Sequence, residues 1–435
     1  MVDWVRFAGE VGAVPAEPAH APHVSSARRS LPRRRVENHR MKPKVDRFAM
    51  ERMQCLYENE VEFNLSESGV WPLSLGELLA DPSARAALDE RPIRYPHSTG
   101  RRELRENVAR FHGGADPDAV MVTNGGSEAN YTALWGLVEK RERVAFMLPN
   151  YLQGWGLARA WGKRADGFGL VPDREADGGP RWRLDLDALA KAVRPDTRVI
   201  VVTNPNNPTG SVLSEPEMDA IVAAARRVGA WIISDEIYRG AEVEGPLTPT
   251  FWGRYARVVV TGGLSKAFGL PGLRTGWILA PPALIRRLCH YHDYLTLTPS
   301  FLSEHLADLV MRPARRDEIL ERTRSLIRRN LPRLESWVAE HADLFDWARP
   351  RAGAIALLRY RLPIASETLC NRLRTERSVL VVPGRHFGIG RYLRVGFGYD
   401  ASRLAEGLRR MGSLLRALQR ARPSESRSRF GSARA

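Results

Sequence analysis

Short apolar runs alternate with amphipathic stretches of helical length between about residue 117 and residue 280 of the chain. This alternation is typical of βα units, in which strands join a parallel sheet and helices pack on its faces. Because the apolar runs are continuous and not alternating, we expect helices to cover both faces of the sheet. The predicted strands lie at residues 119–123, 143–147, 198–203, 231–234, 257–261 and 276–280, and the predicted helices near residues 127–139, 184–193 and 215–229.

A second, smaller region follows the last of these strands. Residues 281–294 begin a long helical pattern, and residues 302–340 continue it with many arginines on one face. A helix at residues 402–420 is predicted to close this region. The predicted strands of its smaller sheet lie at residues 354–359, 379–382 and 393–397. The sequence therefore predicts an α/β fold, with a mainly parallel central sheet sandwiched by helices and a smaller α+β domain.

The length of 435 residues exceeds the usual size of one compact core, so more than one domain is expected. The two ends of the chain lack apolar periodicity and are rich in Ala, Pro, Ser and Arg, which is typical of disordered tails. The predicted segments are a disordered basic leader at residues 1–45, an N-terminal segment that packs with the small domain at 46–84, a large domain at 85–295, a small C-terminal domain at 296–420 and a disordered tail at 421–435.

The net charge of +16 raises the question of a nucleic-acid partner, and the position of the charges argues against one. Residues 1–45 hold nine Lys and Arg against four Asp and Glu, and residues 416–435 hold six against one. The ends therefore contribute +5 each, and the body between them is only modestly basic. We predict solvated tails and no nucleic-acid binding. Met41 and Met50 are candidates for the true start of translation, which would make the leader an annotation artefact.

No run of eighteen apolar residues and no secretion signal occurs in the sequence, which predicts a cytoplasmic protein that does not bind membranes. The cysteines, Cys55, Cys289 and Cys370, are odd in number and unrelated in spacing. They predict neither a disulfide framework nor a metal site.

Lysine is scarce, since only six of the 66 Lys and Arg residues are lysines. Lys266 differs from the others because it lies in GGLSKAFGLPGLRTGW, directly after an apolar strand. A buried lysine is costly unless its amine is neutralised or bonded, and an imine with a cofactor aldehyde achieves this. A surface-loop lysine is the alternative interpretation.

Polar residues at the ends of neighbouring strands match the needs of a pyridoxal 5'-phosphate (PLP) site. Asp235, in SDEIY, is a candidate to hold the protonated pyridine nitrogen, with a helix N-cap as the alternative. Tyr238 and the amide of Asn207, in NPNNPTG, are candidate hydrogen-bond donors to the phenolate oxygen.

A phosphate needs backbone N–H groups at a helix N-terminus and a permanent cation. The TNGGSEAN motif supplies Gly125, Gly126 and Ser127, and Arg274 supplies the cation. The motif has neither a Walker nor a dinucleotide-binding spacing. Tyr151 follows a strand end where a ring can stack on the pyridine, although an ordinary buried tyrosine is the alternative.

The carboxylate of an amino-acid substrate is best bound by a guanidinium group. Arg394, in YLRVGFG, lies on a predicted apolar strand, where an arginine is costly without an anionic partner. Asn207 and Gly69, the latter in NLSESG, complete the predicted substrate site.

These motifs resemble the class I/II aminotransferases of the fold type I PLP-dependent enzymes over roughly residues 60–415. The resemblance implies a homodimer in which Tyr95, in YPHSTG, reaches the neighbour's phosphate. It implies catalytic roles for Lys266 as the Schiff-base lysine, Asp235 and Tyr238. The implied cofactor site comprises Gly125, Gly126, Ser127, Tyr151, Asn207, Asp235, Tyr238, Ser265, Lys266 and Arg274, with Arg394 as the carboxylate clamp.

One position departs from the family pattern, because Gly263 stands where many members have a phosphate-binding serine three residues before the lysine. Locally, LSKAFGLPGLR, HDYLTLT and VVPGRHFG are similar to capreomycidine synthase-like members, which cyclise arginine derivatives. The predicted function is PLP-dependent amino transfer between an amino acid and a 2-oxo acid. The alternatives are a PLP-dependent lyase or cyclase and a non-catalytic regulator that senses PLP.

Overall fold

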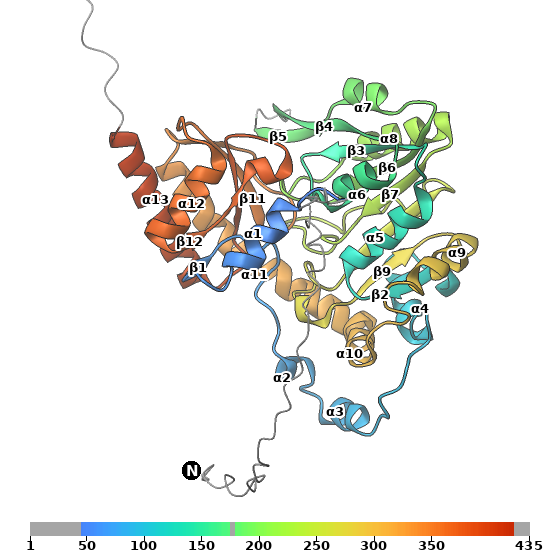
Figure 1. Cartoon of the computed structure of the whole chain (residues 1–435). Helices are drawn as coiled ribbons and strands as arrows, with labels where there is room; N and C mark the ends of the chain where they lie inside the picture. Colours follow the sequence, from blue (N-terminus) through green and yellow to red (C-terminus); the bar gives the residue numbers. More distant parts are fainter. Residues whose placement is uncertain (1–44, 175–178, 422–435) are drawn as a thin grey trace, which may run out of the picture. The chain divides into compact units, whose positions relative to one another are not determined.

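The computed structural model describes residues 45–174 and 179–421 (Figure 1). The predicted leader, except for residue 45, and the predicted tail, except for residue 421, lie outside the described residues. Within this part of the chain, eight strands form a sheet in the order β2-β9-β8-β7-β6-β3-β4-β5. They are β2 (Val120–Thr123), β3 (Arg143–Leu148), β4 (Arg164–Arg174), β5 (Pro180–Leu184), β6 (Thr197–Thr203), β7 (Trp231–Asp235), β8 (Val258–Gly263) and β9 (Gly276–Leu279).

The large sheet is mainly parallel, as predicted. Strands β4, β3, β6, β7 and β8 pair in parallel, whereas β9 runs antiparallel to β8 and β2, and β5 runs antiparallel to β4. Successive residues of β7 enter different cores, because Ile232 packs in one hydrophobic cluster and Ile233 in the other. Both faces of the sheet are therefore covered, which confirms the inference drawn from the continuously apolar strands.

Each face of the sheet has its own set of helices. One cluster contains side chains of α5 (Gly126–Leu137), α6 (Gln153–Trp161) and α9 (Pro282–His292). The other contains side chains of α4 (Arg102–Phe111), α7 (Leu186–Ala192), α8 (Glu215–Val228) and α10 (Phe301–Met311). Because β3, β4, β6, β7 and β8 run parallel, their carboxyl ends lie at the same edge of the sheet.

A second, antiparallel sheet has the strand order β10-β11-β14-β13. Its strands are β10 (Phe345–Trp347), β11 (Ile355–Tyr360), β13 (Val382–Pro383) and β14 (Tyr392–Gly396), and its neighbouring helices are α11 (Pro313–Glu340), α12 (Ser366–Arg377) and α13 (Ala401–Arg420). The predicted helix at 302–340 was wrong in one respect: it is two helices, α10 and α11. Proline at 313 starts a new helix, and Arg312 before it adopts an extended conformation.

The N-terminal part of the described chain lies beside this second sheet. Strand β1 (Phe63–Asn64) pairs in parallel with β12 (Val379–Leu380), more than 300 residues later in the sequence (Figure 1). The backbone of Leu65 continues the pairing by hydrogen bonds to Leu380 and Gly396. The preceding helix is α1 (Ala49–Tyr57), and α2 (Leu75–Leu78) and α3 (Pro82–Asp89) follow. None of the helices in the described ranges has the length and hydropathy that crossing a membrane requires.

Candidate active site

A cavity of about 480 Å³ lies at the carboxyl ends of the central strands. Its wall includes nine of the predicted site residues: Gly126, Ser127, Tyr151, Asn207, Asp235, Tyr238, Ser265, Lys266 and Arg274. Phe48, Met50, Glu51 and Gln54, on and just before α1, form another part of the wall, and none of them was predicted. The structure thus brings together motifs spread over about 150 residues of sequence.

Lys266 follows β8 and directs its amine to a carboxylate on another segment. Lys266 Nζ lies 2.8 Å from Glu67 Oε1. Burial by itself would lower the pKa of Lys266, but the charges of Glu67 and Tyr238 and the hydrogen bond to Glu67 together outweigh burial, and the pKa is raised. The sequence predicted a lysine that needs a partner but did not identify Glu67, whose only signal was its place in the polar NLSESG motif.

Asp235 is the last residue of β7 and is bonded only by neutral groups. Asn130 Nδ2 donates to Asp235 Oδ2 at 2.8 Å, and the Ile237 N–H donates to Oδ1 at 3.1 Å. Burial raises the pKa of Asp235, and these two hydrogen bonds offset part of the effect. A buried carboxylate without a cation partner in the described chain fits a protonated pyridine nitrogen. Asn130 was not predicted, although it lies one helical turn after Gly126 on α5.

Two donors face the cavity near this carboxylate. The Tyr238 hydroxyl is buried and has no hydrogen-bond partner among the described residues. Asn207 Oδ1 accepts from Arg394 Nη1 at 2.9 Å, which leaves Nδ2 of Asn207 as the atom that can donate into the cavity. Both side chains therefore fit the predicted role of donors to a phenolate oxygen.

Arg394, on β14, is fully buried and lies just behind the cavity wall. Its guanidinium donates to Asn207 Oδ1 and to the backbone carbonyl of Ser66, and Nε has no partner in the described chain. A buried guanidinium with only neutral partners is costly, and an anionic ligand would offset this cost. The arrangement fits a carboxylate clamp reached past Asn207. Gly69 adjoins the site, since a Cβ there would lie 3.8 Å from Lys266 Cδ.

The N-terminus of α5 and Arg274 form a cradle for an anion. Gly125 caps the helix with a φ of 103°, and a Cβ at this position would lie 2.5 Å from Arg274 Nη2. The positive φ requires glycine here, and the absence of a Cβ lets the guanidinium of Arg274 approach the start of the helix. Serine cannot occupy position 263, because a Cβ there would lie 2.8 Å from the Thr275 carbonyl oxygen. The close approach of these backbones accounts for the departure from the family pattern.

Tyr151 forms the side of the cavity next to α1. Its hydroxyl donates to Glu51 Oε1 at 3.0 Å, and its ring meets the edge of Phe48 with centroids 4.8 Å apart. Burial, with a contribution from the charge of Glu51, raises the pKa of Tyr151, so the ring stays neutral. Tyr95 lies away from this cavity, with 82% of its surface exposed.

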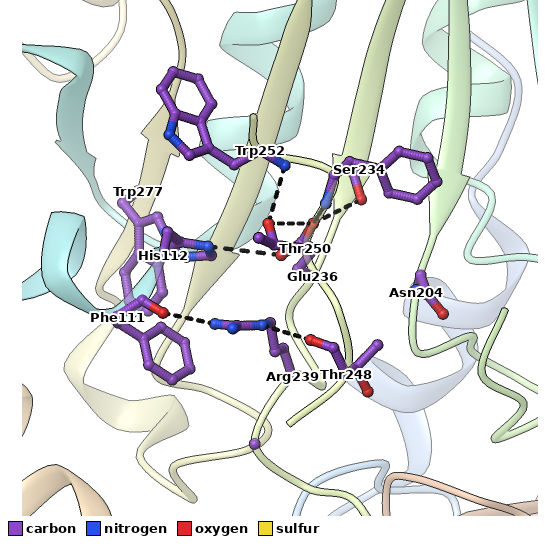
Figure 2. Close-up of polar contacts among 12 residues, drawn as sticks. Phe111, His112, Asn204, Ser234, Glu236, Arg239, Thr248, Thr250, Trp252 and Trp277 are labelled. Carbon is purple, nitrogen blue, oxygen red and sulfur yellow. Dashed lines mark hydrogen bonds and ion pairs between the residues drawn. The ribbon is translucent and has the colours of Figure 1, made fainter. Parts of the chain in front are cut away.

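A buried polar cluster lies on the other side of the β7 strand end (Figure 2). Glu236 Oε1 accepts hydrogen bonds from the Phe251 N–H at 2.9 Å, Thr250 Oγ1 at 3.0 Å and Ser234 Oγ at 3.1 Å. Glu236 Oε2 lies 3.6 Å from His112 Nδ1, and Trp277 Nε1 donates to His112 Nε2. His112 is therefore neutral, with its proton on Nδ1. Burial raises the pKa of Glu236 to about 7.

Arg239 completes this cluster. Its guanidinium donates to the carbonyl oxygens of Thr248 and Phe111, each at 2.8 Å, and stacks over the Phe111 ring (Figure 2). None of Glu236, His112 and Arg239 belongs to the cavity wall. The cluster fixes the backbone that follows Asp235, because the Glu236 N–H donates to Thr261 on β8 and the Arg239 N–H donates to the Glu236 carbonyl.

Known proteins share both the sequence pattern and this architecture. The family described as aminotransferase class I and II matches residues 73–411. Capreomycidine synthase of Streptomyces vinaceus is 33% identical over 357 residues, which cover 80% of this chain and 88% of that protein. Two solved structures are each 29% identical. A PLP-dependent aminotransferase from Streptococcus suis has a TM-score of 0.79, covering 86% of this chain and 99% of its own. The PLP-dependent cyclase OrfR has a TM-score of 0.78, covering 89% and 100%.

Proposed function

The chain belongs to the class I and II aminotransferases, a family of PLP-dependent enzymes, and from this premise we propose that it transfers an amino group between an amino acid and a 2-oxo acid. The observation that carries the proposal is that Lys266 and Asp235 share one cavity of about 480 Å³ with an anion cradle at its edge. The unpartnered Tyr238 hydroxyl and the glycine at 125 fit PLP in that cavity.

Each residue of the cavity has a distinct task in this proposal. PLP, when bound, supplies an electron sink for the pair of electrons left at the substrate α-carbon. Asp235 keeps the proton on the ring nitrogen, and Tyr238 and Asn207 donate to the phenolate oxygen. Arg274 and the first turn of α5 hold the phosphate, and Tyr151 lies against the ring. These residues fix the orientation of the reacting carbon relative to the lysine.

Lys266 is the residue that moves protons. Its amine is displaced when the substrate amine binds, and it is then the base next to the α-carbon. Lys266 would accept the α-proton on its amine and would give the same proton back when the amino group is transferred. Arg394 binds the substrate carboxylate, so that the α-hydrogen points to Lys266 and not to solvent.

A single-turnover experiment tests amino transfer. The holo-protein is mixed with one amino acid at a time in the absence of any 2-oxo acid. We expect one equivalent of 2-oxo acid per active site, together with conversion of the cofactor absorbance to that of its amine form. Product formed over many turnovers without this conversion would contradict amino transfer.

A PLP-dependent cyclase or lyase acting on an amino acid is the second candidate. It is favoured by the likeness to capreomycidine synthase over 80% of this chain and to the cyclase OrfR over 89%. The first steps at Lys266 are the same in both candidates. The two candidates differ in whether the α-proton is returned or a group leaves the β-carbon. The same experiment separates them, since a cyclase gives product with the cofactor absorbance unchanged.

The proposal extends to a cytoplasmic homodimer in which Tyr95 completes the partner's phosphate site. Tyr95 is 82% exposed, and Ile93 beside it is 80% exposed, so this loop has apolar surface available for a second copy. We expect Tyr95→Phe to bind PLP more weakly while the mass in light scattering stays that of a dimer. A monomer of unchanged PLP affinity would contradict this part.

A further inference from the structure

Glu67 is held against the catalytic lysine by a segment outside the large sheet. Besides Lys266 Nζ at 2.8 Å, its Oε1 accepts the backbone N–H groups of Ser68 at 2.8 Å and Gly69 at 2.9 Å. These two hydrogen bonds fix the carboxylate independently of the lysine. The ion pair is partly exposed, with 25% of the Lys266 side chain and 31% of the Glu67 side chain accessible, and Lys266 lines the cavity.

The second sheet determines where this carboxylate lies. A Cβ at position 396 would lie 2.0 Å from the Glu67 carbonyl oxygen, and one at position 398 would lie 2.1 Å from the Gly69 carbonyl oxygen. Glycine at 396 and 398 therefore lets the backbone of residues 67–69 pack directly on the end of β14. Because Arg394 on the same strand donates to the carbonyl of Ser66, the predicted clamp and Glu67 are both held by the contact between β14 and residues 66–69.

The charges of the pair are strongly coupled. Burial alone would raise the pKa of Glu67, but the charge and hydrogen bond of Lys266, together with the N–H groups of Gly69 and Ser68, lower it to about 2. The carboxylate therefore stays ionised at any working pH. An opposite charge this close favours the ammonium form of a free lysine amine.

We propose that Glu67 is a positioning residue for Lys266, which holds the amine in place and stabilises its ammonium form whenever the amine is not covalently bound. This inference rests on the proposed function of Lys266 as the proton-transfer group. When the Lys266 amine takes the α-proton, its lone pair becomes an N–H bond and the C–H electron pair passes to the cofactor. The resulting ammonium is the species that Glu67 binds. Glu67 thus makes the lysine a stronger base that is neutral over a narrower pH range.

The pKa of Lys266 can be measured without catalysis, by labelling the cofactor-free full chain with an amine reagent at a series of pH values. Mass spectrometry of the Lys266 peptide gives the labelling midpoint, and Lys163 serves as an internal reference. We expect Glu67→Gln, which keeps the size and the acceptor oxygen, to lower the midpoint by about 1–3 pH units. Labelling at a fixed pH below both midpoints then rises at least about tenfold.

Glu58→Gln is the matched control, because Glu58 is a neighbouring carboxylate near Glu67 that makes no hydrogen bond to Lys266. We expect the Lys266 labelling midpoint to shift in Glu58→Gln by less than about a third of its shift in Glu67→Gln. Circular dichroism checks folding, and Glu67→Ala must give the same shift if the charge is responsible. A Lys266 midpoint that is unchanged in both Glu67 variants would overturn the proposal.

The holo-protein provides a second readout. In Glu67→Gln we expect the acid limb of the kcat–pH profile, which reports the neutral amine, to move to lower pH while the plateau rate falls. An unmoved acid limb would also count against the role of Glu67. Failure of the proposed role of Lys266 as the PLP-linked base is distinguishable, because in that case wild-type Lys266 forms no covalent adduct with PLP at all.

Discussion

The side chains of two consecutive acidic residues, Asp235 and Glu236, have opposite surroundings. Asp235 ends β7 on the cavity side, where two neutral donors leave its charge without a cation in the described chain. Glu236 turns to the other side of the sheet, where three donors converge on one oxygen and His112 faces the other (Figure 2). The protein itself completes the surroundings of Glu236, whereas in the proposed function a ligand completes those of Asp235.

This contrast separates the acid that we propose to be functional from one that the core fully satisfies. Burial raises the pKa of both groups, so the shift alone does not distinguish them. The geometry does, because only Asp235 faces a cavity large enough for a ligand ring. We therefore expect substitutions on the cavity side to reduce catalysis, and substitutions in the Glu236 cluster to reduce stability.

The largest effect is expected at Lys266, the cavity residue nearest the chemistry. Lys266→Ala removes both covalent attachment and the proton-transfer base, so turnover should fall by about 10⁴-fold or more. Lys163→Ala is the control, because Lys163 is half exposed and pairs with Asp196 on the surface. Steady-state rates and the visible absorbance of the cofactor measure the loss. Equal rates in the two variants would exclude Lys266 from the reaction.

Asp235→Asn tests the cavity side of the comparison directly. The amide cannot hold a proton on the ring nitrogen by charge, so kcat should fall by about 10²–10³-fold. The free energy of unfolding should not fall, because an unpaired buried charge is removed. Kinetics and urea unfolding of the same preparation measure both quantities. If the variant has a normal kcat and a reduced free energy of unfolding, Asp235 serves the stability of the fold and not catalysis.

Glu236→Ala tests the core side. The substitution leaves the hydroxyls of Ser234 and Thr250 and the Phe251 N–H without their acceptor and opens a cavity. We expect the free energy of unfolding to fall by about 2–4 kcal/mol. Activity per folded molecule should change much less than in Asp235→Asn. The comparison breaks down if kcat falls while the melting temperature is unchanged.

The smallest expected effect is the pH dependence of stability that Glu236 contributes. Its folded pKa of about 7 is above the ordinary value of 4.5, so the folded state binds the proton more tightly. The stability gained by protonation is full at acid pH and is lost as pH rises to about 7. Between about pH 5 and about pH 8 this amounts to about 2 kcal/mol.

Urea unfolding of the wild type and Glu236→Gln across this range isolates that contribution. Burial lowers the pKa of His112, so His112 changes the free energy of unfolding with pH in the direction opposite to Glu236. It does so in both proteins, and Arg239 stays charged. The difference between the two proteins should therefore report Glu236. Parallel stability curves would show that Glu236 stays ionised at every pH tested.

The sequence predicted the central strands because they are continuous apolar runs with polar residues at their ends. Strands β4 and β5 and helix α6 were missed. Strand β4 contains glycines at 167 and 169 and alternates irregularly between exposed and buried positions near the sheet edge. Its pairing depends on β3 and β5 and not on a local pattern. Tertiary contacts thus decided the outer part of the sheet.

The residues of the cavity also divide into those predicted from local sequence patterns and those that only tertiary contacts brought there. Motifs in chain order, from Gly126 to Arg274, predicted nine residues of the wall, because most of these motifs lie next to the ends of predicted strands. Asn130, Glu51 and Glu67 were missed. Glu67 is 199 residues from Lys266 in the sequence, and a glutamate in a polar loop carries no signal of such a contact.

The sequence by itself determined the central strands of the sheet, the strand ends that carry polar chemistry and the resemblance that implies PLP, since all of these are written in local patterns of a few residues. Only the tertiary structure decided that Asp235 faces a cavity while Glu236 faces the core, and that a segment packed on β14 brings a carboxylate to the lysine. Those outcomes depend on which surfaces exclude water from each other, and no short stretch of sequence contains both partners.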